Sequence, residues 1–289
     1  MDLSQLIESA EAQRPATGFT FTEGPVWHPS QHFYYFVDVR ESKFYRLRPG
    51  GSAELLREKT GEGNGTTFDP QGRLIQCEGG NARLTRWPAD GKFASSEVLI
   101  DKIDGKRLNR PNDVICASDG SVYFTDPNLR VPLAQRQQET AAIHRVKPDG
   151  SVSKVADFEY PNGLALSPDE RILYVANTRF AAYIHAVELD SAGNMVRRRI
   201  FADMSSDEKV GVPDGMKVDT LGNVYCTGPG GTWVFAPDGA KIGIIKTPEV
   251  PANLCFGGPD MKTMFFTAHS SVYTLQCKVP GLPGHPFRG

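Results

Sequence analysis

The sequence of 289 residues has no long apolar run and no excess of charge of one sign. Lys and Arg together number 32 and Asp and Glu 34, so the formal net charge is −2. A nucleic-acid or anionic-membrane partner would require a basic face, and we therefore expect neither. No segment has the length and apolarity of a membrane span, and the first residues lack the basic and apolar regions of a secretory signal. These absences predict a soluble protein.

Cysteine is scarce and widely spaced. The five residues are Cys77, Cys116, Cys226, Cys255 and Cys277. Their odd number and the absence of a CxxC pair disfavour a disulfide framework and a zinc site. Most of them fall within apolar, strand-like stretches and are predicted to be buried thiols. We therefore expect a reduced, cytoplasmic protein.

Long helical periodicity is nearly absent, whereas glycine (29 residues) and proline (21 residues) recur at regular intervals. The one exception is a short helix that Leu3, Leu6 and Ile7 suggest. Elsewhere short apolar strands alternate with turns, which is typical of an all-β fold.

A turn followed by an apolar strand recurs along the chain. The copies are DPQGRLIQCEG (69–79), ASDGSVYFTD (117–126), SPDERILYVAN (167–177), DTLGNVYCTG (219–228), GPDMKTMFFTA (258–268) and the weaker HPSQHFYYFVD (28–38). A period of about 40–50 residues with three or four strands is that of a propeller blade. We predict one domain over 1–289, an all-β six-bladed β-propeller with four-stranded antiparallel blades around a central channel. Residues 1–16 would be an N-terminal extension and 278–289 a C-terminal tail.

One polar residue opens the innermost strand of each copy. These residues are Glu23, Asn64, Asn112, Asn162, Asp214 and Asn253. Inner strands of a propeller surround one axis, so we expect the six side chains to form a ring around the channel. Any one of them could simply be a turn residue before glycine. Six in register favour a shared ligand instead, because buried carboxylates without a partner are costly.

The donor set of this ring indicates what the ligand is. Two carboxylates with amide oxygens, without sulfur or imidazole, suit a hard divalent cation. We predict one such ion, with Ca²⁺ first and Mg²⁺, Mn²⁺ or Zn²⁺ as alternatives. Water alone could also satisfy the amides.

The hairpin that follows Asn112 returns to the same face of the propeller. Its last residue, Asp126, is a candidate substrate contact, with a strand-end turn residue as the alternative. The segment 127–142 is longer than the other connections at this point, and we predict that it forms a partial lid. Asp113, the neighbour of Asn112, is expected to point away from the channel and to support its neighbours.

Four motifs in order carry a resemblance to a known family. EGP (23–25), RPND (110–113), PNG (161–163) and PDG (213–215) resemble the family of senescence marker protein, gluconolactonase and luciferin-regenerating enzyme, whose members are six-bladed propellers. The similarity runs from about Thr22 to Cys277. The stretches around RPND and KTPEVPANLCFGGPD (246–260) are similar to bacterial gluconolactonases in particular. The clearest departure is GNGTTFD (63–69), which is unusually polar for an inner strand.

The resemblance also implies roles for single residues. It implies that Glu23, Asn112, Asn162 and Asp214 bind the divalent metal and that Arg110 contacts the substrate. Asn112 would lie against the substrate as well. The resemblance assigns no role to Asn64, which we take as a substrate or water contact.

The activity implied by the resemblance is hydrolysis of a sugar lactone, such as an aldono-1,5-lactone, to the aldonic acid. We expect Asp214 to be the general base and Glu23 to be second in that role, while attack by a hydroxide on the cation stays open. The partner would be the small-molecule lactone, and the protein a monomer or a small homo-oligomer. The alternatives are hydrolysis of another lactone, an ester or an organophosphate, or a non-enzymatic propeller used for binding.

Overall fold

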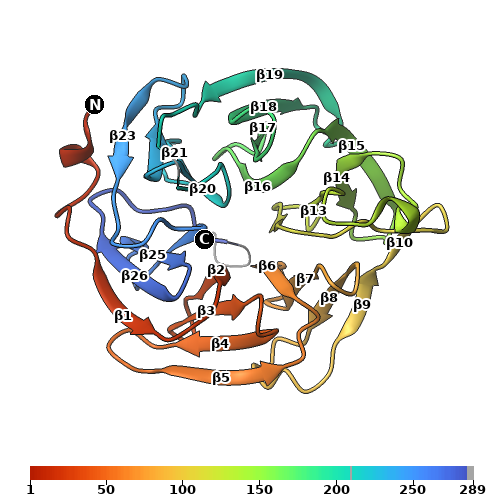
Figure 1. Cartoon of the computed structure of the whole chain (residues 1–289), viewed down its shortest axis with the longest axis horizontal. Coiled ribbons are helices and arrows are strands. Elements are labelled where there is room, and N and C mark those ends of the chain that lie inside the picture. The colour runs from red at the N-terminus through yellow and green to blue at the C-terminus, as the bar shows by residue number, and fades with distance from the viewer. Residues whose placement is uncertain (209, 285–289) are drawn as a thin grey trace.

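The computed structural model describes residues 1–208 and 210–284. Six four-stranded antiparallel sheets surround a central channel, which confirms the predicted six-bladed propeller (Figure 1). In five of the sheets the strands pair in chain order from the channel to the periphery. This order follows from the sequence, because strands joined by short turns pair with their neighbours in the chain.

The first three blades occupy the N-terminal half of the chain. Blade one comprises β2 (Thr22–His28), β3 (Phe33–Asp38), β4 (Lys43–Leu47) and β5 (Ala53–Glu58). Blade two comprises β6 (Gly63–Phe68), β7 (Leu74–Glu78), β8 (Arg83–Trp87) and β9 (Glu97–Ile100). A small hairpin of β10 (Lys102–Ile103) and β11 (Lys106–Arg107) precedes blade three, which comprises β12 (Val114–Cys116), β13 (Val122–Asp126), β14 (Ala141–Val146) and β15 (Val152–Phe158).

The other three blades complete the ring. Blade four comprises β16 (Pro161–Leu166), β17 (Ile172–Asn177), β18 (Tyr183–Leu189) and β19 (Met195–Asp203). Blade five comprises β20 (Met216–Val218), β21 (Val224–Gly228), β22 (Gly231–Phe235) and β23 (Lys241–Ile245). Blade six comprises β24 (Asn253–Gly257), β25 (Thr263–Ala268), β26 (Ser271–Gln276) and, as its outermost strand, β1 (Gln13–Thr17).

Blade six joins the two ends of the chain. β1 pairs antiparallel with β26, with Ala16 opposite Val272. Hydrogen bonds between the two ends of the chain therefore complete the sheet of the last blade and close the ring. Part of the segment predicted as an N-terminal extension thus lies in a blade. The predicted short helix is a single 3₁₀ turn, η1 (Leu3–Gln5), and the buried Leu6 and Ile7 follow it.

The described part of the C-terminal tail lies against blades five and six. The backbone N–H of Leu282 donates to the carbonyl of Val218 at 3.0 Å, and that of Thr220 donates to Pro280 at 2.9 Å. Gly281 donates in the same way to Met261 at 2.9 Å. Residues 285–289 of the predicted tail lie outside the described residues.

Apolar residues fill the spaces between the blades. Tyr34 of blade one stacks on Phe265 of blade six, with ring centroids 4.4 Å apart. All five cysteines are buried and free, which confirms the prediction of buried thiols. Among the described helices, none is long and apolar enough to cross a membrane.

Candidate functional site

The polar ring residues lie at irregularities of the inner strands. In β2 the register shifts between Glu23, which is opposite Val37, and Val26, which is opposite Tyr35. The same shift of one residue occurs at Asn64 in β6 and at Asn162 in β16. A β-bulge of this kind redirects side chains and is frequent beside active sites. The repeated bulge therefore accounts for a polar residue at the start of an otherwise apolar strand.

Blade three has an equivalent irregularity just before β12. Thr125 accepts a hydrogen bond from the N–H of Asn112 at 2.9 Å and donates its own N–H to the carbonyl of Asp113 at 3.0 Å. Asn112 and Asp113 thus both pair with Thr125, as in a β-bulge. The regular alternation of side chains between the two faces of the strand is interrupted here.

This irregularity corrects the expectation for Asp113. The carboxylate is buried and acts electrostatically on both Glu23 and Asp214, which belong to blades one and five. Asp113 therefore lies within the channel together with the ring residues and does not point away from it.

Glycines let the inner strands approach one another. A Cβ added to Gly65 would overlap Asp113, one added to Gly163 would overlap the carbonyl of Asp214, and one added to Gly215 would overlap the side chain of Asn253. None of these three glycines has a positive φ. At these three positions the close approach of the next blade therefore requires a glycine. Only at Gly24, whose φ is 55°, does a left-handed backbone conformation also favour glycine.

The polar inner strand of blade two has an explanation in the same contacts. Thr66 is buried and donates its hydroxyl to the carbonyl of Gly24 in blade one at 2.6 Å, while Gly65 donates its N–H to the carbonyl of Asn112 in blade three at 2.8 Å. The threonine and glycine of GNGTTFD thus connect three successive inner strands.

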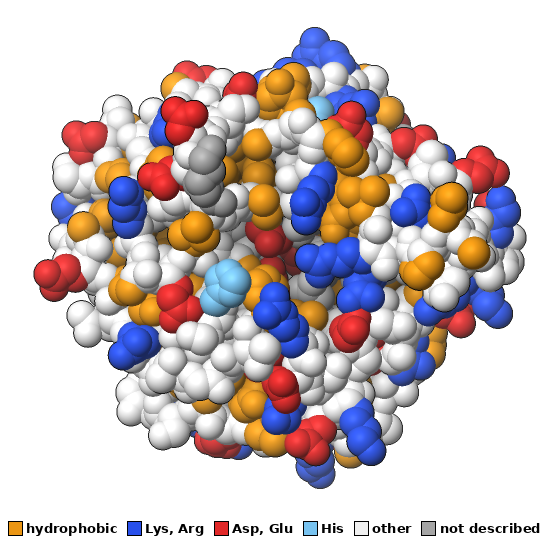
Figure 2. Space-filling model, in the orientation of Figure 1, with side chains coloured by type: hydrophobic (Ala, Val, Ile, Leu, Met, Phe, Trp, Pro, Cys, Tyr) orange, Lys and Arg blue, Asp and Glu red, His pale blue; other side chains and the backbone are white. Residues whose placement is uncertain are grey.

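Two of the carboxylates in the channel have strongly perturbed acidity. Glu23 is 3% exposed, and burial together with the charge of Asp113 raises its pKa to about 7. Burial and the charges of Glu23 and Asp113 raise the pKa of Asp214 well above its usual range. Figure 2 shows the mouth as a central hollow with acidic side chains at its base and Lys and Arg side chains around it. The concentrated negative charge favours a cation at this position.

The amides of the ring are oriented in a way that fits a cation. Asn162 donates its side-chain nitrogen to the hydroxyl of Thr178 at 2.8 Å, while its buried Oδ1 has no hydrogen-bond partner among the described residues. Asn253 donates to Glu23 Oε2 at 2.9 Å, and the N–H of Gly24 donates to the same oxygen at 2.7 Å. An unpaired buried oxygen requires a partner, and a hard cation would supply it.

The remaining ring residues contribute differently. Asn64 and Asn112 are partly exposed, and their backbone carbonyls are approached by the neighbouring blades at Gly24 and Gly65. Within the described residues, no group of three or more His, Cys, Asp or Glu side chains is arranged to hold a metal. A cation here would therefore depend on the amide oxygens as much as on the carboxylates.

Arg110 and Asp126 lie beside the channel mouth. Arg110 is half-buried and pairs with Glu62, a partner that the sequence did not indicate. Asp126 has no exposed surface, and its carboxylate accepts the backbone N–H groups of Asn109 at 2.8 Å and Arg110 at 2.7 Å. The direct substrate contact expected of Asp126 stays a prediction, and the carboxylate is fully buried in this structure. Its carboxylate holds the loop that carries Arg110.

The segment predicted as a partial lid contains η2 (Leu133–Gln135) and is anchored to the β10–β11 hairpin. Gln137 accepts the N–H of Arg107 at 2.7 Å, and Gln138 donates to the carbonyl of Lys106 at 3.0 Å. Arg130 in this segment is exposed and lowers the pKa of Asp214. The segment therefore brings a positive charge to the neighbourhood of the ring, and whether it covers a bound substrate stays a prediction.

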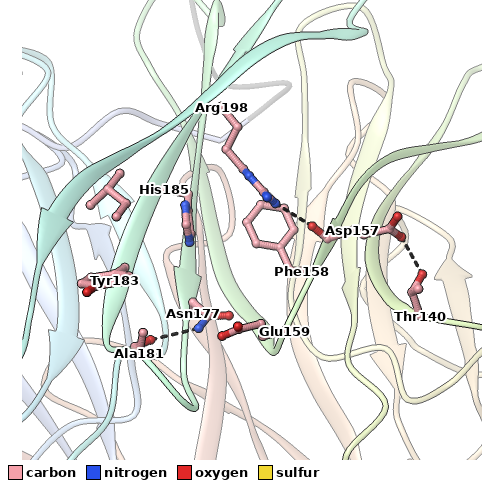
Figure 3. Close-up of a pocket in the computed structure, with 10 residues that line it drawn as sticks. Thr140, Asp157, Phe158, Glu159, Asn177, Ala181, Tyr183, His185 and Arg198 are labelled. Carbon is pink, nitrogen blue, oxygen red and sulfur yellow. Dashed lines mark hydrogen bonds between the residues drawn. The ribbon is translucent and has the colours of Figure 1, made fainter.

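Apart from the channel, a cavity of about 370 Å³ lies between blades three and four (Figure 3). Phe158 contacts His185 edge-on, and Arg198 lies over the Phe158 ring at 4.8 Å from its centroid. The cavity contains none of the six ring residues. Phe158 and His185 lie on β15 and β18, away from the inner strands, so this groove is separate from the candidate site.

Residues 21–270 match the family model described as the SMP-30/Gluconolactonase/LRE-like region. The chain belongs to this family. It is 30% identical to a gluconolactonase of Zymomonas mobilis, over 92% of this chain and 81% of that protein, and 29% identical to a pentonolactonase of Haloferax volcanii, over 85% of this chain and 80% of that protein. A solved gluconolactonase structure from Xanthomonas campestris is 33% identical, has a TM-score of 0.87 and covers 95% of this chain and 92% of that one.

Proposed function

We propose that this protein is a lactonase that hydrolyses a sugar lactone of the gluconolactone class to its aldonic acid with the help of one divalent cation. The observation that carries the proposal is the convergence of carboxylates and an unpaired amide oxygen at the mouth of the channel. Membership of the family and the similarity to proteins named gluconolactonase and pentonolactonase support the substrate class. We place the reaction in the reducing cytoplasm, which the buried free thiols support.

The residues that would hold the cation are Glu23, Asn112, Asn162 and Asp214, and Ca²⁺ is our first choice because every donor is oxygen. A bound divalent cation supplies Lewis acidity to the lactone carbonyl and stabilises negative charge on its oxygen.

The chain's own residues would carry out the proton transfer. Asp214 is our choice of general base, because an ionised carboxylate beside the cation can accept the proton of the attacking water. Asp214 takes a proton from the attacking water while the water oxygen bonds to the lactone carbonyl carbon. The acyl C–O bond of the ring then breaks, and Asp214 returns the proton to the ring oxygen, which becomes a hydroxyl of the aldonic acid. Glu23 is less suited to this role, because two donors already bind its Oε2.

Arg110 and Asn64 would bind the substrate hydroxyls at the mouth. The planar guanidinium of Arg110 presents several donors, and its pairing with Glu62 keeps the side chain at the rim before substrate arrives.

Chelator treatment tests this function. The purified protein is stripped of cations, single cations are added back, and acid release from glucono-1,5-lactone is followed in a pH-stat. We expect the stripped protein to be inactive and Ca²⁺ to restore the activity. Full activity in the stripped protein would contradict the cation-dependent mechanism.

A lactone or ester with an apolar substituent is the second candidate substrate. Leu133 in η2 is 80% exposed, and Phe180 in the connection between β17 and β18 is 79% exposed. Exposed apolar side chains on the connections between strands would suit a substrate with an apolar part. A panel of aldonolactones, alkyl lactones, aryl esters and organophosphates separates the two candidates by kcat/KM.

A further inference from the structure

Two charged side chains at the mouth are paired across blades. Arg110 lies in the loop before β12 of blade three, and Glu62 lies between β5 and β6, directly before the inner strand of blade two. The guanidinium of Arg110 donates to the carboxylate of Glu62. Among the described residues, neither side chain has another hydrogen-bond or ion-pair partner. The side chains of Arg110 and Glu62 are 27% and 43% exposed, so substrate and product can reach the pair from solution.

The backbone holds both members of the pair in place. The N–H of Arg110 donates to Asp126 at 2.7 Å, and the N–H of Glu62 donates to the hydroxyl of Ser42 at 3.0 Å. Glu62 has a φ of 54°, a conformation that costs a non-glycine residue free energy and persists only where surrounding contacts impose it. Its carbonyl accepts the N–H of Gly79 at 3.2 Å. These contacts fix the direction in which the Glu62 side chain leaves the backbone.

Two glycines in the turn between β7 and β8 make room for the pair. A Cβ added to Gly79 would lie 3.2 Å from Cγ of Arg110, and one added to Gly80 would lie 3.3 Å from Cγ and Cδ of Glu62. Neither glycine has a positive φ, so backbone conformation does not require glycine at these positions. The space above residues 79–80 is therefore what the two glycines provide, and the paired side chains fill it.

The pair changes what the mouth can bind. A free guanidinium is a planar fork of donors that binds a carboxylate through two parallel hydrogen bonds. Glu62 already occupies part of this fork and cancels its charge. The proposed reaction converts an uncharged lactone into an aldonate, which carries a carboxylate. The aldonate carboxylate must displace Glu62 to use the fork, whereas the hydroxyls of the lactone can use the remaining N–H donors.

We propose that Glu62 is a specificity-determining residue that acts through Arg110. By neutralising the guanidinium, it lets the mouth bind the uncharged lactone and release the anionic product. Glu62 is in this sense a positioning residue, since it touches Arg110 and not the substrate. The inference rests on the proposed function, because that function makes the product an aldonate.

The test measures product binding directly, without turnover. Wild type, Glu62→Gln, Arg110→Met and the double variant are saturated with Ca²⁺ and titrated with gluconate by calorimetry, and KM for glucono-1,5-lactone is measured on the same proteins. Glutamine keeps the shape of Glu62 and removes its charge, so we expect Kd for gluconate to fall by about tenfold while KM for the lactone changes by less than about threefold. The tightening should shrink as NaCl is raised from about 0.05 to about 0.5 M, because salt screens exposed charges.

Two comparisons separate this role from a purely structural one. In the Arg110→Met background, Glu62→Gln should change Kd for gluconate by less than about twofold, because the guanidinium through which Glu62 acts is gone. Glu54→Gln weakens a matched pair with Arg46 on the outer strands of blade one and should leave Kd for gluconate unchanged.

Four results would each overturn the inference. They are a Kd of Glu62→Gln that stays near that of wild type, no detectable gluconate binding by this variant, a tightening that high salt leaves in place, and an equal tightening in the absence of Arg110. Hydrolysis of gluconolactone together with any of these results would count against this inference alone. A wild type that does not hydrolyse gluconolactone would count against the proposed function.

Discussion

The side-chain amide of Asn253 donates a 2.9 Å hydrogen bond to Glu23, a residue 230 positions earlier in the chain. Asn253 begins the inner strand of the last blade and Glu23 lies in that of the first, so the bond crosses the closing seam of the propeller. A proposed ligand carboxylate is thus oriented by a residue from the opposite end of the sequence. The site is complete only when the ring is closed.

Replacement of Asp214 by Asn tests the proposed general base. The amide cannot accept the proton of the attacking water, so we expect kcat for gluconolactone hydrolysis to fall by at least about a hundredfold. Initial-rate kinetics at saturating Ca²⁺ measure the loss. Asp238→Asn, at an exposed turn of the same blade, should keep wild-type rates. Wild-type kcat in Asp214→Asn would rule out Asp214 as the base.

Replacement of Arg110 by Met tests the substrate clamp. Loss of the guanidinium removes its hydrogen bonds to the substrate, and we expect KM to rise by roughly tenfold or more while Ca²⁺ affinity changes little. The matched control is Arg46→Met, which breaks a pair with Glu54 on the outer strands of blade one and should not affect KM. An unchanged KM in Arg110→Met would remove this residue from the substrate site.

The pH dependence of stability tests the buried state of Asp126. Burial raises its pKa from 3.8 to about 7, so between these values the folded state keeps a proton that the unfolded state has released. This carboxyl therefore stabilises the fold fully below pH 4, and the contribution is lost as the pH rises towards 7.

The Asp126→Asn variant isolates this contribution. Urea unfolding at several pH values should show that wild type loses up to about 1.4 kcal/mol per pH unit relative to Asp126→Asn between pH 4 and 7. Parallel pH profiles of the two proteins would show that Asp126 has an ordinary pKa.

Replacement of Gly215 by Ala tests the close approach of the inner strands. The added methyl group overlaps the side chain of Asn253, so we expect the free energy of unfolding to fall by about 1–3 kcal/mol. Ca²⁺ binding should weaken as well, because Asn253 orients Glu23. Gly284→Ala serves as the control, since its methyl group meets no atom within 4 Å. Equal free energies of unfolding of the two variants would show that the inner strands can move apart at Gly215 without a loss of stability.

The architecture was predictable because its determinants are local. Short turns, alternating strands and a period of one blade all lie within a few dozen residues, and they predicted six blades and the positions of the ring residues. The clustering of Glu23, Asn162, Asp214 and Asn253 then followed from the symmetry of a propeller.

The sequence pattern was insufficient where the position of a side chain depends on contacts that the repeat does not determine. Strict alternation placed Asp113 outside the channel, but an extra residue at the start of the inner strand turns it inward. No sequence pattern indicates that backbone amides from the preceding loop bind the carboxylate of Asp126, which is fully buried. Neither the bulge nor the loop contact has a period that a sequence pattern could reveal.

The sequence by itself determined the blade count and the polar residue that opens each inner strand, because these depend on contacts between neighbours in the chain. Only the tertiary structure decided which charges share the channel. Glu23 and Asp113 lie on different blades, and Gly65 of the blade between them lets its strand approach Asp113 closely. The accumulation of carboxylates in the channel is therefore a property of the closed ring, since no single repeat contains both of them.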